Sequence, residues 1–87
     1  MTPSRPISNA RYGEIKEKAL KEPQVAALLE KMQAAPEGSD AYKAAAHAYT
    51  GALFSTMRKL DPSQEDALTR KEGAYQRRID AGKPILE

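Results

Sequence analysis

The sequence predicts an all-α fold, a small three-helix domain with a kinked first helix, a long central second helix and a capped third helix. Apolar residues recur at intervals of three and four positions through most of the chain. Stretches of Pro, Gly, Ser and Asp separate these segments, as turns do. No segment alternates between apolar and polar residues over the length of a strand.

The first helix is expected from about residue 9 to Ala35. Ser8 or Asn9 supplies the side-chain oxygen that caps its free N–H groups. Pro23 interrupts the apolar pattern and has no backbone N–H. We therefore expect either a kink there or a second start with Pro23 in the first helical position.

The second helix is expected from about Asp40 to Leu60, after the turn sequence Pro36-Glu37-Gly38-Ser39. Ser39 or Asp40 is the natural cap of this helix. One side of it carries the best core-forming stripe in the chain, which consists of Tyr42, Ala45, Ala46, Tyr49, Ala52, Leu53, Met57 and Leu60.

The third helix is expected to follow Asp61, with Pro62 in its first position and Gln64 completing a capping box. Gly82 is expected to end it in the left-handed conformation. Its apolar stripe is narrow and consists of Leu68, Tyr75 and Ile79.

A chain of 87 residues has room for one domain, which we place at residues 9–82. A flexible N-terminal arm (1–8) precedes it, and a C-terminal tail (83–87) follows and ends in Leu86-Glu87, a pair that cloning sites often leave. Alanine supplies 15 of the 35 hydrophobic residues. Because burial stabilises in proportion to apolar area, such a core leaves a single chain modestly stable, and self-association would add to its stability.

The sequence predicts no enzyme, no cofactor and no metal site. The absence of cysteine excludes disulfides, thiolate metal sites and cysteine nucleophiles. His47 is the single histidine, and no carboxylate lies one turn away from it to orient the ring. There is no glycine-rich phosphate loop, and no apolar run approaches the roughly 20 residues that span a bilayer.

Beside its core stripe, the second helix carries a face on which small residues recur every three to four positions. Such spacing lets another helix approach closely, and Gly51 inside a helix costs about 1 kcal/mol relative to Ala, a cost that close packing would explain. We assign to this candidate partner-binding face Ala44, His47, Ala48, Gly51, Phe54 and Arg58.

Two interpretations of this face are open. In the first and more common arrangement, the face receives the first and third helices of the same chain. In the second, it binds another protein, and the chain is a non-enzymatic interaction or assembly module that forms a homodimer with Phe54 as the main contact.

An alternative function is nucleic-acid binding, or a related regulatory role. The cations that would carry it are Arg58, Lys59, Arg70, Lys71, Arg77 and Arg78. We disfavour it, because the net charge is only +2 and because Asp61, Glu65 and Asp66 would face the DNA backbone with the wrong sign. A further alternative is a small inhibitor of a larger partner protein.

The N-terminus has no apolar segment of a signal peptide. Met1 precedes the polar, proline-containing sequence Thr2-Pro3-Ser4-Arg5-Pro6. Two origins fit this N-terminus. Met1 was added before a mature exported domain (periplasmic or secreted), or it is the native first residue of a cytoplasmic protein. We lean slightly to the first.

Overall fold

The computed structural model describes residues 8–82, which form four α-helices. They are α1 (Asn9–Leu20), α2 (Pro23–Ala34), α3 (Asp40–Leu60) and α4 (Glu65–Asp80), and a short 3-10 turn, η1 (Pro62–Gln64), precedes α4. The described residues contain no strand, so the all-α prediction is confirmed. The predicted arm and tail lie outside the described residues, except for Ser8.

The predicted kinked first helix is in fact two separate helices. Ser8 caps α1, and its hydroxyl oxygen accepts a hydrogen bond of 3.2 Å from the backbone N–H of Arg11. The helix ends at Leu20, and Pro23 then takes the first position of α2. A proline there lacks an N–H and clashes with the carbonyl four residues earlier, so the chain restarts rather than continuing through a kink.

The start of α3 and the end of α4 agree with the sequence prediction. Gly38 adopts a left-handed conformation with φ +80°, and Ser39 caps α3 by accepting a hydrogen bond of 3.1 Å from the N–H of Tyr42. Gly82 has φ +78° and follows the last turn of α4. Left-handed backbone favours glycine because it has no Cβ, which explains both positions.

The start of the third predicted helix differs from the expectation. Asp61 does cap the turn, because its carboxylate accepts hydrogen bonds from the backbone N–H (3.2 Å) and the hydroxyl (2.5 Å) of Ser63. However, residues 62–64 form the 3-10 turn η1, and the regular helix begins only at Glu65. Gln64 makes no capping hydrogen bond with its side chain, so the expected capping box is absent.

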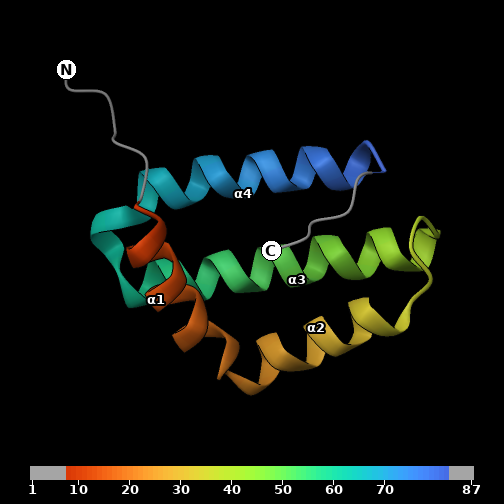
Figure 1. Cartoon of the computed structure of the whole chain (residues 1–87), viewed down its shortest axis with the longest axis horizontal. Helices are drawn as coiled ribbons and strands as arrows, with labels where there is room; N and C mark the ends of the chain where they lie inside the picture. Colours follow the sequence, from red (N-terminus) through yellow and green to blue (C-terminus); the bar gives the residue numbers. More distant parts are fainter. Residues whose placement is uncertain (1–7, 83–87) are drawn as a thin grey trace.

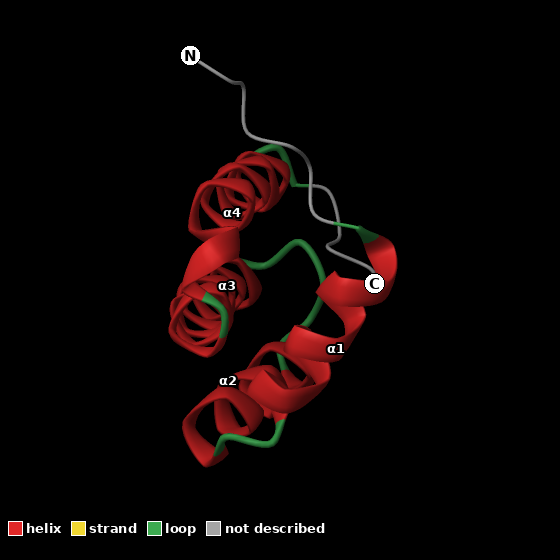
Figure 2. Ribbon diagram, turned by 90° about the vertical axis from the view of Figure 1, so that its left-hand side faces the viewer, coloured by secondary structure: helices red, strands yellow, loops and turns green. Residues whose placement is uncertain are grey.

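The four helices are arranged around α3 (Figure 1). Helices α2 and α4 lie on either side of α3, so that the three form a layer, and α1 crosses one side of that layer (Figures 1 and 2). Helix α3 packs against all three other helices, and the backbone of α1 lies beside those of α2 and α3. The end-on view shows no helix on the side of the layer opposite α1 (Figure 2).

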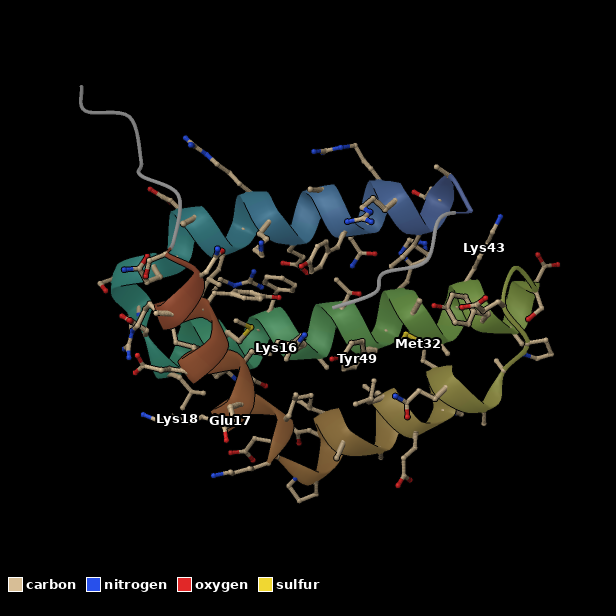
Figure 3. All side chains as sticks on the ribbon, in the orientation of Figure 1. Lys16, Glu17, Lys18, Met32, Lys43 and Tyr49 are labelled. Carbon is tan, nitrogen blue, oxygen red and sulfur yellow. The ribbon has the colours of Figure 1, made fainter. Side chains whose placement is uncertain are left out.

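The core lies between α1 and this layer and extends between α2 and α3, where the buried cluster includes Met32 of α2 and Tyr49 of α3 (Figure 3). Leu60, which the sequence placed in the core stripe, is 44% exposed, because it lies at the last turn of α3 beyond the main helix contacts. The hydrophobic residues in the buried cluster are Tyr12, Ile15, Ala19, Val25, Met32, Ala46, Tyr49, Leu53, Phe54, Met57, Leu68 and Ile79.

Candidate interaction surface

Phe54 is a core residue, not a surface residue. Its side chain is 0% exposed. The ring centroid lies 6.2 Å from that of Tyr12 on α1 and 5.6 Å from that of Tyr75 on α4. The sequence expectation that Phe54 forms the main contact with a partner is therefore corrected, because α1 and α4 of the same chain already cover its ring.

His47 and Arg58 join α3 to α4. His47 is hydrogen-bonded through Nδ1 to Gln76 Oε1 and through Nε2 to Asp80 Oδ1, the latter at 2.8 Å. Arg58 donates a hydrogen bond of 2.5 Å from Nη1 to Glu72 Oε1, and both of these side chains are largely shielded from solvent. These two residues thus hold the neighbouring helix of the same chain, in agreement with the first interpretation of this face.

The remaining residues of the predicted face stay uncovered. Ala44 and Ala48 are exposed, and Ala41 continues their line toward the start of α3. Gly51 and Ser55 continue it toward the other end and are half-buried. We call these five residues the open face of α3. At 100° per residue, it lies about 180° around the helix from the buried residues of the core, on the side of the layer away from α1.

Gly51 is not required by the packing of the described chain. A Cβ atom placed on it would meet no atom within 4 Å outside the local helix backbone. An alanine there would fit in the monomer and would stabilise the helix. The helical cost of Gly51 therefore has no explanation among the contacts of the described residues.

A shallow groove runs beside the open face, between α3 and the second half of α2. Its volume is about 410 Å³. Lys31 is the one charged residue in its lining, and the other residues are apolar. The lining residues are Leu28, Lys31, Ala34, Ala35, Ala41, Ala44, Ala45 and Ala48.

Both ends of α3 carry charged residues. The beginning of the helix carries Asp40 and Lys43, with Glu37 in the turn before it; Asp40 and Glu37 are exposed, and Lys43 is half-buried. The end carries Lys59, which is also exposed, while the charge of Arg58 is paired with Glu72. The open face between these ends contains no charged residue.

At the opposite end of the molecule, Arg11 and Asp61 join α1 to the turn after α3. Arg11 donates hydrogen bonds from Nε (2.9 Å) and Nη2 (2.7 Å) to Asp61 Oδ2. Hydrogen bonds from the Ser63 hydroxyl and from Arg11 lower the pKa of Asp61 below its ordinary value of 3.8, and the bond to Asp61 raises the pKa of Arg11. This pair fixes the position of α1 and does not contribute to the open face.

Two of the six cations of the nucleic-acid hypothesis interact with other side chains of the same chain. Arg58 is paired with Glu72, and Lys71 lies over two aromatic rings, with Nζ 4.6 Å from the centroid of Tyr12 and 5.5 Å from that of Tyr75. Lys71 thus serves the contact between α1 and α4. The other four cations are exposed: Lys59, Arg70, Arg77 and Arg78.

Within residues 8–82, no three His, Asp or Glu side chains are grouped so that they could hold a metal ion. None of the described helices is both long enough and apolar enough to cross a bilayer.

The comparisons with known proteins give no family for this chain. No protein-family model, no curated protein and no solved structure matches it.

Sequence reasoning missed the partners of His47. Gln76 and Asp80 are 29 and 33 residues away from it in the chain, so no local pattern joins them. Their spacing of four residues does place them on one face of α4, which was a usable signal. The sequence could not show, however, that this face of α4 turns toward α3.

Proposed function

We propose that this protein is a non-enzymatic interaction module that forms a homodimer through the open face of α3 and the adjoining groove. The observation that carries the proposal is the uncovered row of small residues centred on Ala48 and Gly51, with no atom near the missing Cβ of Gly51. This proposal keeps the homodimer of the sequence hypothesis but places the contact on the open face instead of at Phe54.

The small residues of the open face allow a second helix to approach α3 closely. Packed helices lie 8–10 Å apart, depending on the side chains between them, and Ala and Gly permit the lower end of this range. Because Ala44 and Ala48 are already exposed on a rigid helix, little side-chain entropy is lost when they become buried. Burial of the apolar groove lining would then contribute about 25 cal/mol for each Å² removed from water.

The small size of the fold supports the same proposal. The buried cluster of the described residues holds two alanines and ten larger hydrophobic side chains, but a chain of 87 residues removes only roughly 60% of its unfolded surface from water. A second copy that covers the open face would add apolar burial that the monomer lacks, and linkage would make the protein more stable as its concentration rises.

The test is sedimentation equilibrium over a tenfold concentration range on the wild type and on Ala48→Glu. This substitution places a carboxylate on an exposed position, so the monomer keeps its core, but two carboxylates would meet at the centre of the dimer. We expect a wild-type dimer and a folded Ala48→Glu monomer. Gln33→Glu is the matched control, since Gln33 is also exposed but lies about 200° around α2 from Lys31 in the groove.

A wild type that stays monomeric throughout the range would overturn the proposal. So would a dimer that Ala48→Glu leaves intact, because the contact would then lie elsewhere. Circular dichroism of each variant establishes that the helices are retained.

A further inference from the structure

We propose that His47 forms a pH-sensitive contact: its protonated ring binds the end of α4 to α3, and loss of the proton releases this end. Both ring nitrogens face oxygen atoms of α4, and only the protonated ring donates a hydrogen bond to each of them. The contact is independent of the homodimer, because His47 is not one of the five residues of the open face.

The atoms around the ring of His47 fit the imidazolium form. Nδ1 meets Oε1 of Gln76, and Nε2 lies 2.8 Å from Oδ1 of Asp80. Nε2 of Gln76 donates to the backbone carbonyl of His47 at 3.5 Å, so it is the amide oxygen that faces the ring. A carboxylate accepts hydrogen bonds and has none to donate. A proton is therefore needed on each ring nitrogen.

A neutral ring can serve only one of these two oxygens. It carries a single N–H, so either Gln76 or Asp80 would then face the lone pair of the other nitrogen. Histidine is the side chain whose charge ordinarily changes between pH 5 and 8. The stabilisation from this contact is thus present on the acidic side of that range and is lost as the pH rises.

The contact lies at the end of α4, where the charge of the ring matters most. Asp80 is the last residue of this helix. The helix dipole disfavours a carboxylate at a C-terminal end and favours a cation there. The imidazolium of His47 supplies that cation from α3, whereas a neutral ring leaves the carboxylate at the unfavourable end of the dipole.

The other charged groups around His47 do not titrate in this range. Ammonium, guanidinium and carboxylate groups ordinarily keep their charges between pH 5.5 and 8.5. Lys43, one turn before His47, extends toward the side of α4 (Figure 3), while α2 lies on the opposite side of α3 and α1 crosses toward its other end (Figure 1). The charged residues within about two turns of His47 on α3 or of Gln76 on α4 are Asp40, Lys43, Arg70, Lys71, Glu72, Arg77, Arg78 and Asp80.

The test is a double-mutant cycle on the full chain, with wild type, His47→Ala, Asp80→Ala and the double variant unfolded in urea at pH 5.5 and at pH 8.5. The two side chains are 36% and 74% exposed, so the variants keep the core intact. We expect the pair to change the unfolding equilibrium constant by a coupling factor of about threefold at pH 5.5 and of about one at pH 8.5, since exposed ion pairs contribute modestly.

The matched control is the cycle of Arg58→Ala and Glu72→Ala. This pair joins the same two helices, with Arg58 Nη1 2.5 Å from Glu72 Oε1, but contains no histidine, so its coupling should be equal at both pH values. A coupling between His47 and Asp80 that is equal at the two pH values, or larger at pH 8.5, would overturn the proposal. A coupling of about one at both would also overturn it, because the contact would then not form.

Amide hydrogen exchange in the last turn of α4 gives a second, local measurement. After correction for the intrinsic effect of pH on exchange, the protection of these amides in wild type should fall about threefold from pH 5.5 to pH 8.5. In His47→Ala the protection should be the same at both pH values. A fall of equal size in this variant would show that another group causes the change and that His47 does not.

Discussion

The ring of Phe54 on α3 meets the ring of Tyr75 on α4 nearly edge to face, with the ring planes at 73° and the centroids 5.6 Å apart. Aromatic rings favour this geometry because the positive edge of one ring approaches the negative face of the other. The contact fixes α4 against α3 at the centre of the molecule. It also removes Phe54 from the surface on which the sequence had placed it.

Replacing Phe54 should therefore cost stability. We expect Phe54→Ala to lower the free energy of unfolding by about 3–5 kcal/mol, because it leaves a cavity between Tyr12 and Tyr75. Urea unfolding followed by circular dichroism measures the loss. Phe54→Leu retains most of the volume and should lose less, so it keeps the test valid if the alanine variant does not fold. A loss below about 1 kcal/mol for Phe54→Ala would show that the ring is not core.

Replacing Thr50, in contrast to replacing Phe54, should raise the free energy of unfolding. Its side chain is 1% exposed, and its hydroxyl oxygen has no hydrogen-bond partner in the structure. Valine has nearly the same shape without the polar group, so Thr50→Val should raise the free energy of unfolding by about 1 kcal/mol. Thr56→Val is the matched control. The Thr56 hydroxyl donates a hydrogen bond of 2.9 Å to the carbonyl of Ala52, and its removal should bring no gain.

Gly51→Ala should stabilise the monomer but weaken the dimer. At concentrations where the chain is monomeric, the added methyl group meets open space, and we expect a gain of about 0.5–1 kcal/mol from helix propensity. In the proposed dimer the same methyl group would enter the contact with the second copy. Sedimentation equilibrium should then show weaker association. Gly82→Ala, at φ +78°, is the control that should destabilise the monomer.

The pair formed by Arg11 and Asp61 predicts a dependence of stability on pH. Because the pKa of Asp61 in the folded chain is lower than its ordinary 3.8, the carboxylate contributes its full stabilisation above pH 3.8. That contribution is lost as the pH falls through the folded value. Wild type should therefore be more stable than Asp61→Asn at neutral pH, and the difference between their urea midpoints should shrink below pH 3.8.

Ser63→Ala tests the cause of this shift. The Ser63 hydroxyl makes the largest contribution to lowering the pKa of Asp61, so its removal should move that pKa upward toward 3.8 in an NMR titration of the carboxyl group. A difference between wild type and Asp61→Asn that stays constant down to the lowest pH at which both fold would contradict the assignment.

Most of the positions at which helices begin and end could be predicted from the sequence because the signals are local, although the start of α4 at Glu65 was not. Ser39 caps the helix that follows it, Gly38 and Gly82 take the left-handed conformation, and Pro23 starts a new helix. Each of these effects depends on atoms within about four residues along the chain. The split into four helices was left open because a proline permits both a kink and a restart, and in the structure α1 ends at Leu20 and α2 starts at Pro23.

Only the tertiary structure decided which residues of the candidate face of α3 are covered by other helices and which stay exposed. Helical periodicity placed Phe54 and Ala48 on one broad side of α3, but it does not specify which neighbour covers each part of that side. Helix α4 turned out to cover Phe54, His47 and Arg58 and to leave Ala44 and Ala48 exposed. The direction of a helix after a turn depends on contacts between residues far apart in the chain, such as the 29 positions between His47 and Gln76. Those contacts form only when the whole core packs, and they leave no pattern in either segment alone.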